Sequence, residues 1–287
     1  MNEKNRNLAL RVGSALLLFP LLVWVTWIGG LPFALVLAGA AAVSALELTG
    51  MFTPIGYPEM FGAVVAALLP LAPWWAAQNA AHAIPPLIPI ALAVAAMALL
   101  VLNLFRPGPL DGAPQRVAAS ALAWLYCGVL IATVCGVRMR FGFAWVILVF
   151  VVTWLNDTLA YFAGRLFGKT PFYPKVSPKK TWEGFLGGVA GSVLGALGTK
   201  AVFLAVPLPA GERFDLGWSS CVVLALGAAV LGPVGDLAES MLKRAAGVKD
   251  SGRLLPGHGG LLDRIDALLF IAPWMYLWAS LTASVAG

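Results

Sequence analysis

Apolar runs of about 20 residues recur along the chain and limit what it can fold into. A helix needs about 20 apolar residues to cross the roughly 30 Å hydrocarbon core of a bilayer. The candidate runs cover residues 13–30, 32–50, 60–79, 86–105, 117–136, 142–163, 183–206, 218–237 and 265–284. They are continuously apolar rather than alternating, which favours helices over the strands of a membrane barrel. We therefore expect an all-α polytopic membrane protein with about nine transmembrane helices.

The charge content excludes an ordinary soluble domain. Charged residues make up 11% of the 287 residues, against roughly 25% in soluble domains. The first apolar run is too long for the core of a cleaved signal peptide and is followed by further runs, so we expect it to remain as a span. The cysteines, Cys127, Cys135 and Cys221, fall in or beside predicted spans without metal-binding spacing, which indicates packing residues.

The basic residues predict how the spans are oriented. With the N-terminus in the cytoplasm, fifteen of the nineteen Lys and Arg residues fall on the inside and four on the outside. Such an excess is typical of cytoplasmic loops in membrane proteins. The basic cytoplasmic face should attract anionic membrane lipids, and we expect no nucleic-acid partner.

The acidic residues are concentrated in the second half of the chain. Nine of the thirteen follow residue 153, whereas Glu47 is the one acidic residue of note in the spans before residue 150. The sequence shows no internal repeat and no low-complexity linker. We expect one membrane domain over 1–287, in which 1–140 supplies mainly scaffold spans and 141–287 supplies the catalytic spans and cytoplasmic loops.

The segment "NDTLAYFAGRLFGK" places polar residues inside an apolar span. A carboxylate at the centre of a span costs about 2.5 to 3.5 kcal/mol, so it usually faces the bundle interior or a wet cavity. Asp157, Tyr161 and Gly164 recur at helical spacing, so they should share one helix face, directed at the bundle interior or a wet cavity. The alternative is that Asp157 pairs with a Lys or Arg only to join helices. The following "GRLFGKT" lacks the glycine spacing and the preceding strand of a P-loop.

The segment "KVSPKKTWEGFLGG", residues 175–188, brings three lysines to the start of the seventh run. Ser177 followed by Pro178 predicts a helix start with Ser177 as the N-cap. Lys179 and Lys180 beside such a helix start would form an anion site. The alternative is an ordinary basic anchor on the cytoplasmic side.

The segment from Gly232 to Asp266 carries the densest group of charges. Four of its polar residues should share one face of a helix that leaves the membrane, namely Asp236, Glu239, Ser240 and Lys243. A glycine-containing loop, "DSGRLLPGHGG", then leads to Asp263 and Asp266, one helical turn apart. Carboxylates from two helices suit Mg²⁺, which shares its oxygen ligands with phosphates. The alternative is a charged loop whose residues pair with one another, with His258 in a hydrogen bond within the loop.

The order of residues from Ser240 to Asp266, "SMLKRAAGVKDSGRLLPGHGGLLDRID", resembles the phosphatidate cytidylyltransferases, or CDP-diacylglycerol synthases. The segments "NDTLAYFAGRLFGK" and "SPKKTWEG" are also similar to that family. The resemblance implies that CTP and phosphatidate give CDP-diacylglycerol and pyrophosphate in phospholipid biosynthesis, in the bacterial inner membrane. It implies a homodimer and Mg²⁺, with K⁺ as a second cation. The family's metal-binding positions fall on Asp236 and Asp263.

The resemblance and the charge pattern together suggest roles for individual residues. Nucleotidyl transfer needs positioning and charge neutralisation more than covalent chemistry. We expect catalytic roles for Asp236, Asp263, Lys243, Arg244, Lys249 and Arg264. We expect substrate-binding roles for Asn156, Asp157, Ser177, Lys179, Lys180, Ser240, Asp250, His258, Gly259, Gly260 and Asp266. The sequence leaves open whether Asp250 and Asp266 contact the metal directly.

Two other functions remain alternatives at this point. One is another CTP-using lipid phosphotransferase or a lipid kinase, although the DG, AR, G, D, D array of CDP-alcohol phosphotransferases is absent from the sequence. The other is an ion-coupled transporter in which Asp157 and Asp236 line an ion path. Transporters often consist of repeated halves, and the sequence shows none.

Overall fold

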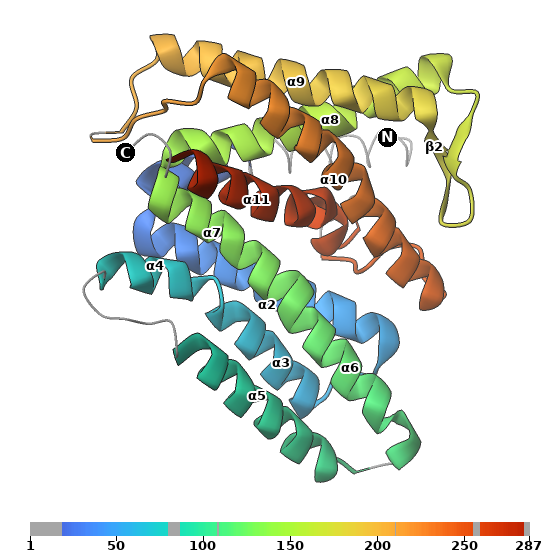
Figure 1. Cartoon of the computed structure of the whole chain (residues 1–287). Helices are drawn as coiled ribbons and strands as arrows, with labels where there is room; N and C mark the ends of the chain where they lie inside the picture. Colours follow the sequence, from blue (N-terminus) through green and yellow to red (C-terminus); the bar gives the residue numbers. More distant parts are fainter. Residues whose placement is uncertain (1–18, 80–86, 108, 210, 255–258, 284–287) are drawn as a thin grey trace, which may run out of the picture. The chain divides into compact units, whose positions relative to one another are not determined.

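The computed structural model describes residues 19–79, 87–107, 109–209, 211–254 and 259–283 (Figure 1). These residues form two compact units. The first unit consists of Ile28–Met139 and Asp250–Asp263, and the second consists of Phe19–Trp27, Arg140–Lys249 and Arg264–Gly287. The loop 250–263, which carries several predicted site residues, thus belongs to the same unit as the first half of the chain. The expectation of one domain over the whole chain stays a prediction.

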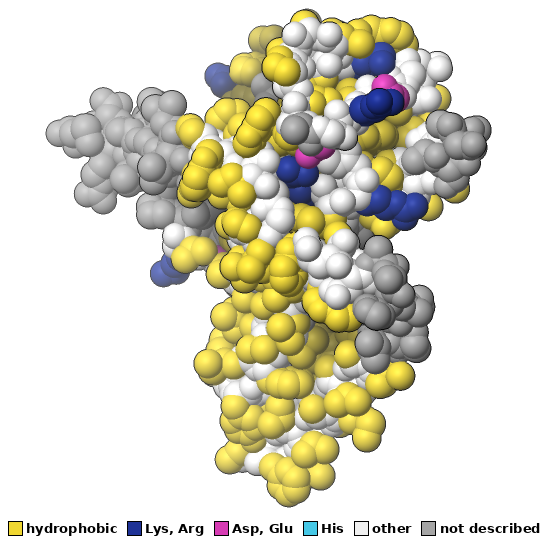
Figure 2. Space-filling view, turned by 90° about the vertical axis from the view of Figure 1, so that its left-hand side faces the viewer, with side chains coloured by type: hydrophobic (Ala, Val, Ile, Leu, Met, Phe, Trp, Pro, Cys, Tyr) yellow, Lys and Arg dark blue, Asp and Glu magenta, His cyan; other side chains and the backbone are white. Residues whose placement is uncertain are grey.

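The described residues confirm an all-α polytopic membrane protein. Seven helical segments are long and apolar enough to cross a membrane, namely Gly30–Phe52, Tyr57–Gln78, Leu110–Phe141, Phe143–Phe167, Trp182–Ala205, Trp218–Ala245 and Leu262–Thr282. Two shorter apolar helices, Phe19–Ile28 and Pro89–Leu104, coincide with the first and fourth predicted runs, which extend into residues outside the described part. In Figure 2 hydrophobic side chains cover much of the surface that is not grey, and the charged side chains lie in small groups.

The first unit is a bundle of apolar helices. Its elements are α2 (Gly30–Phe52), α3 (Tyr57–Leu68), α4 (Leu71–Gln78), α5 (Leu87–Leu104), the 3₁₀ turn η1 (Leu110–Gly112), α6 (Ala113–Ala123), the π-helical segment η2 (Trp124–Val129) and α7 (Leu130–Phe141) up to Met139. Phe33 and Leu48 of α2 are fully buried. The buried Glu59 fixes the start of α3, where its carboxylate accepts from Gly56 N at 2.9 Å and from Arg106 Nη1 at 2.5 Å.

The second unit contains α8 (Phe143–Phe167), a hairpin of β1 (Pro171–Tyr173) and β2 (Ser177–Thr181), α9 (Trp182–Ala205), α10 (Trp218–Ala245) and α11 (Leu262–Ala283) from Arg264 onward. Figure 1 shows α8 and α9 lying side by side. Glycines let these two helices meet backbone to backbone: a Cβ at Gly184 would lie 3.0 Å from the Ala160 carbonyl oxygen, and a Cβ at Gly191 would overlap the Leu155 carbonyl oxygen. Small residues commonly allow such close helix contacts in membranes.

Gly191→Leu is expected to destabilise the second unit, because the new side chain must push α8 away from α9. Overpacking of this kind costs about 1 to 3 kcal/mol or more, so we expect a clear drop in the thermal unfolding midpoint of the purified protein, measured by intrinsic fluorescence. Gly198→Leu on the same helix is the matched control, because a Cβ there meets nothing within 4 Å. Equal midpoints for the two variants would contradict the assigned helix contact.

The predicted helix start at Ser177 is wrong. Ser177 belongs to strand β2, which pairs antiparallel with β1 so that Tyr173 lies opposite Ser177 and Pro171 lies opposite Thr181. Proline disfavours helical conformation in the residue before it, and Ser177 is therefore extended. Helix α9 begins at Trp182, where Thr181 is the N-cap and its Oγ1 accepts from Gly184 N at 3.1 Å. Lys179 and Lys180 accordingly lie on a strand.

Candidate active site

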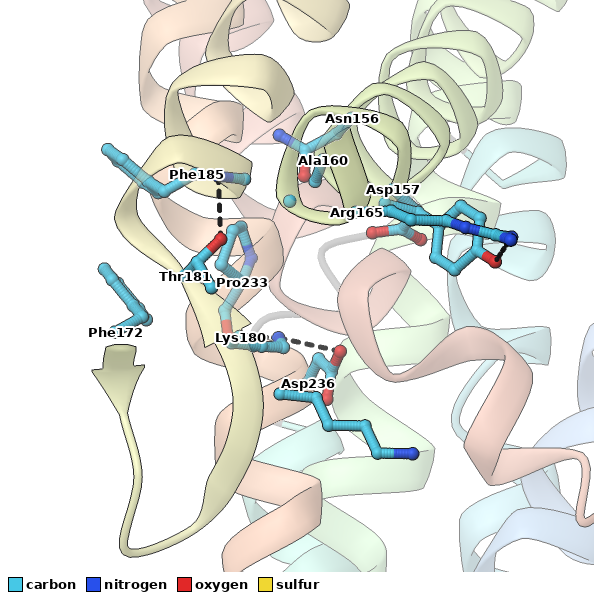
Figure 3. Close-up of a pocket in the computed structure, with 14 residues that line it drawn as sticks. Asn156, Asp157, Ala160, Arg165, Phe172, Lys180, Thr181, Phe185, Pro233 and Asp236 are labelled. Atoms are coloured by element: carbon cyan, nitrogen blue, oxygen red, sulfur yellow. Dashed lines mark hydrogen bonds and ion pairs between the residues drawn. The ribbon is translucent and has the colours of Figure 1, made fainter. Parts of the chain in front are cut away.

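A cavity of about 400 Å³ lies within the second unit (Figure 3). Its lining residues come from α8, the β-hairpin, α9 and α10. The lining residues are Asn156, Asp157, Ala160, Tyr161, Gly164, Arg165, Phe172, Lys179, Lys180, Thr181, Gly184, Phe185, Pro233 and Asp236. The volume falls in the range of about 300 to 1,000 Å³ that small-molecule sites occupy. Three cations, two carboxylates and three aromatic rings thus border one space.

The prediction that Asp157, Tyr161 and Gly164 share one helix face is confirmed, because all three line the cavity from α8. Arg165, one position further on, donates from Nη1 to the Tyr161 hydroxyl at 3.0 Å. The charged groups that act on Asp157 include Asp236, Lys180 and Arg264. Charges of both signs therefore surround the carboxylate, as a polar binding site requires.

Asn156 is almost completely buried and ties α8 to α9. Its Nδ2 donates to Ser192 Oγ at 2.8 Å and to the Gly188 carbonyl oxygen at 3.2 Å. The amide oxygen has no hydrogen-bond partner among the residues that the structure describes. Because Asn156 also borders the cavity, this buried amide both braces the helix pair and contributes to the polar wall.

An ion pair connects the hairpin to α10 at the edge of the cavity. Lys180 Nζ lies 2.7 Å from Asp236 Oδ2, with side-chain exposures of 26% and 36%, and also donates to the Pro233 carbonyl oxygen at 3.4 Å. The second carboxylate oxygen of Asp236 accepts from Ser240 Oγ at 3.2 Å. Figure 3 shows the two side chains pointing toward each other from separate elements. The structure therefore places an ammonium and a carboxylate together at the same edge of the cavity.

The prediction that Asp236, Glu239, Ser240 and Lys243 share one face of α10 is confirmed, because Ser240 contacts Asp236 and Lys243 contacts Glu239 one turn apart. The carboxylate of Glu239 is fully buried and forms an ion pair with Lys243 one turn later. Lys243 does not line the cavity. The exposed Arg244 donates from Nη1 to the Val248 carbonyl oxygen at 3.3 Å. The phosphate contacts proposed for Lys243 and Arg244 stay predictions.

Asp266 of α11 adds a further carboxylate to those of Asp157, Asp236 and Glu239 in the second unit. The groups that act on it electrostatically include Asp236, Glu239 and Asp157. Its own Oδ1 accepts from Ala267 N at 2.8 Å. Helices α10 and α11 approach closely here, since a Cβ at Gly235 would lie 2.6 Å from the Asp266 carbonyl oxygen. Asp266 is therefore held in the same charged group as Asp236.

Asp263 lies in the first unit, at the end of the loop 250–263 and in the first turn of α11. Its Oδ2 accepts three hydrogen bonds: from Ser251 N at 2.9 Å, from Ser251 Oγ at 3.0 Å and from Gly260 N at 2.8 Å. Gly259 has φ +84°, and a Cβ there would lie 2.9 Å from Asp263 Oδ2. A glycine is thus required at position 259, because a side chain there would meet the Asp263 carboxylate.

Three further predicted site residues, Lys249, Asp250 and Gly260, do not line the cavity. Lys249 and Asp250 are exposed at the start of the loop, and Gly260 is buried within it. His258 lies outside the described residues.

Within the described part of the chain, no group of three or more His, Cys, Asp or Glu side chains is arranged to hold a metal ion. A metal held by this protein would therefore need oxygen ligands from water or substrate in addition to carboxylates, as is usual for Mg²⁺.

No sequence motif pointed to Glu183, whose carboxylate fixes the chain just before the hairpin. Its carboxylate accepts from Lys169 N at 3.1 Å, from Thr170 N at 3.2 Å and from Thr170 Oγ1 at 2.9 Å. Nearby, the rings of Phe172 and Phe185 stack with centroids 5.5 Å apart and planes inclined by 12°. Both rings line the cavity, so these contacts hold one of its walls.

Glu183→Ala is expected to loosen the hairpin, because three hydrogen bonds at its first residues are lost. Local opening exposes chain segments to proteases, so trypsin should cleave after Lys175 or Lys179 about tenfold faster in the variant than in the wild type. Mass spectrometry of the fragments from detergent-solubilised protein measures this rate. An unchanged cleavage rate would show that the hairpin is held by its other contacts.

Comparison with known proteins identifies the family of the chain. The sequence pattern of the cytidylyltransferase family matches residues 9–282. The chain therefore belongs to the cytidylyltransferase family and is a multi-pass membrane protein with nucleotidyltransferase chemistry.

Relatives from several bacteria carry a more specific name. A protein of Brucella abortus (strain 2308) named phosphatidate cytidylyltransferase is 34% identical over 282 residues, which cover 96% of this chain and 95% of that protein. The phosphatidate cytidylyltransferase of Thermotoga maritima is 40% identical over 166 residues, covering 57% and 59% of the two chains. That of Bacillus subtilis (strain 168) is 36% identical over 169 residues, covering 58% and 60%.

Proposed function

We propose that this protein is a phosphatidate cytidylyltransferase that converts CTP and phosphatidate to CDP-diacylglycerol and pyrophosphate in the bacterial inner membrane. The observation that carries the proposal is the cavity of the second unit, in which Lys179, Lys180 and Arg165 face the carboxylates of Asp157 and Asp236. A site of this kind in helices that can cross a membrane suits a reaction between a lipid and a charged nucleotide. The family membership supplies the nucleotidyl-transfer chemistry.

The reaction needs one new phosphorus–oxygen bond and the loss of another. A phosphate oxygen of phosphatidate attacks the α-phosphorus of CTP, and the bond from that phosphorus to the bridging oxygen of pyrophosphate breaks. Phosphatidate is anionic at neutral pH, so no side chain has to remove a proton. The protein contributes by aligning the two phosphates and offsetting their mutual repulsion.

The cations that line the cavity offset the repulsion between the two phosphates. Lys179 and Lys180 come from β2, and Arg165 comes from the last turn of α8. Charge-assisted hydrogen bonds to phosphate are about twice as strong as neutral ones. Lys180 is already held by Asp236 and the Pro233 carbonyl, so its ammonium is positioned before substrate arrives. We assign further phosphate neutralisation to Lys243, Arg244, Lys249 and Arg264.

We propose Asp236 and Asp263 as ligands of Mg²⁺, with K⁺ as a second cation. The residues fit such an ion: Asp236 presents a partly exposed carboxylate to the cavity, and Asp263 is oriented by three hydrogen bonds to one of its oxygens. Mg²⁺ is commonly bound through one or two carboxylates together with substrate phosphates. When bound, it would neutralise charge on the triphosphate and on the departing pyrophosphate. Asp250 and Asp266 would support this group of carboxylates.

The membrane arrangement that we propose follows from the distribution of basic residues. Fifteen of nineteen lie inside if the N-terminus is cytoplasmic, which also puts the loop 250–263 and the hairpin on the cytoplasmic side. CTP would then reach the site from the cytoplasm while phosphatidate stays in the bilayer. We further propose that the protein forms a homodimer.

The direct test is the reaction itself. Purified protein in lipid nanodiscs, given CTP, phosphatidate, Mg²⁺ and K⁺, should release pyrophosphate and form CDP-diacylglycerol in equal amounts, measured by a coupled assay and by mass spectrometry. Formation of pyrophosphate without the CDP-lipid would indicate a different CTP-using enzyme. Absence of both products from folded protein would overturn the proposal and favour a lipid kinase or a transporter.

A further inference from the structure

We propose that Glu47, on helix α2, is a positioning residue that holds residues 251–252 and 260–262 in the arrangement that orients Asp263. The proposal rests on the function proposed above, in which Asp263 serves the reaction. Glu47 is 214 positions away from Leu261 in the sequence, and neither motif nor spacing connects the two. Both belong to the first unit.

The Glu47 carboxylate accepts hydrogen bonds from two backbone amides at the start of α11 and lies beside the Ser251 hydroxyl. Oε1 accepts from Leu261 N at 3.0 Å, Oε2 accepts from Leu262 N at 2.9 Å, and Ser251 Oγ lies 3.3 Å from Oε2. The first amides of a helix have no partner inside the helix. A carboxylate placed there satisfies them and interacts favourably with the helix dipole. Glu47 thus caps α11 from another helix.

Ser251 links Glu47 to Asp263. Its hydroxyl lies 3.0 Å from Asp263 Oδ2 and 3.3 Å from Glu47 Oε2, and its backbone amide donates to Asp263 as well. Ser251 and Leu262 are buried. The two carboxylates therefore share one serine and divide four backbone amides between them, so that a displacement of Glu47 disturbs the contacts of Asp263.

The glycines of the loop are shaped around these two carboxylates. A Cβ at Gly252 would lie 2.7 Å from the Glu47 carboxyl carbon, and a Cβ at Gly260 would lie 2.7 Å from Glu47 Oε2. Side chains at these two positions would expel Glu47, just as a side chain at Gly259 would meet Asp263. Glycine at positions 252 and 260 thus leaves room for the Glu47 carboxylate. This supports a specific role for Glu47.

Three variants break this contact in different ways. Glu47→Ala removes the carboxylate, and Glu47→Gln keeps its size but turns one acceptor into a donor that faces a backbone N–H. Gly252→Ala leaves Glu47 intact and fills its place. The matched controls are Glu59→Gln, which alters a different carboxylate of the first unit that is fully buried, and Gly39→Ala on the same helix as Glu47, where a Cβ meets nothing within 4 Å.

Hydrogen–deuterium exchange of the full-length protein in nanodiscs reports on the loop without any substrate. We expect the amides of Leu261 and Leu262 to exchange at least about tenfold faster in the three test variants, because local opening of the helix start becomes easier. The two controls should exchange at the wild-type rate in this segment. Unchanged exchange in Glu47→Ala would overturn the proposal.

Kinetics in the same nanodiscs test the link to Asp263. Loss of a residue that orients a metal ligand commonly lowers metal affinity or activity about 10- to 100-fold, so we expect kcat to fall and the Mg²⁺ concentration for half-maximal rate to rise within that range, while KM for CTP changes less than about threefold. Faster exchange with unchanged kcat and Mg²⁺ dependence would overturn the positioning role. An equal loss of kcat in Glu59→Gln, at an equal loss of thermal stability, would do the same.

The two proposals can fail separately. If the wild type forms no CDP-lipid and the exchange of Leu261 and Leu262 still depends on Glu47, the assigned reaction is wrong and the hold of Glu47 on the loop is correct. If the wild type is active and the exchange does not depend on Glu47, the reaction is correct and the inference about Glu47 is wrong.

Discussion

Asp236→Asn is expected to abolish formation of CDP-diacylglycerol, with kcat lowered by at least about 1,000-fold. The substitution keeps the shape of the side chain but removes its charge, both for the proposed cation and for Lys180, which lies 2.7 Å away. Charge neutralisation by a metal contributes several kcal/mol to reactions of phosphates, and each 1.36 kcal/mol corresponds to about a factor of ten in rate. Initial rates with radiolabelled CTP measure the loss.

The control for this variant is Asp215→Asn, which neutralises an exposed carboxylate of the same unit that does not line the cavity. We expect it to retain wild-type activity within about twofold, as surface substitutions usually have small effects. Unfolding midpoints of both variants should be compared, because a collapsed Asp236→Asn protein would also be inactive. A folded Asp236→Asn enzyme with substantial activity would exclude Asp236 from the site.

Lys180→Met is expected to lower kcat/KM about 100-fold. Methionine keeps an apolar stem of similar length but removes the ammonium, and hydrogen bonds to charged groups contribute about 1.5 to 3 kcal/mol. The substitution also leaves Asp236 without its ion-pair partner. Steady-state kinetics with CTP and with phosphatidate as the varied substrate will show which KM rises, and hence which phosphate Lys180 contacts.

Lys175→Met provides the comparison for this prediction, because Lys175 lies on the same hairpin, is exposed and does not line the cavity. We expect it to retain most of its activity. If both lysine variants lose activity equally, the hairpin contributes only a general positive potential at the membrane surface, and the specific contact assigned to Lys180 is wrong.

The fold was predictable because the thickness of a bilayer limits the length of a span. The apolar runs of the sequence coincide with helical segments, and the helical period alone brought Asp157, Tyr161 and Gly164 to one wall of the cavity. Both results depend on local patterns within one helix. Patterns of this kind can be recognised from the spacing of residues along the sequence.

The hairpin was not predictable from the same kind of reasoning. Ser177 followed by Pro178 is compatible with the first turn of a helix and with an extended strand, and pairing with residues 171–173 decided for the strand. The ion pair of Lys180 with Asp236 depends on how the hairpin lies against α10. Glu47 gave only one signal, an isolated acidic residue near the end of an apolar run, and its partners lie more than 200 positions away.

The glycine contact between α8 and α9 has a further consequence for ligand binding. Gly164 and Gly184 form part of the cavity wall, and neither has a side chain with rotamers. A ligand that lies against this wall orders no side chain there, whereas each long side chain that a ligand immobilises costs about 0.5 to 1.5 kcal/mol. The entropic cost of binding therefore falls on long side chains such as those of Arg165 and Lys179, which can also adjust to different phosphate positions.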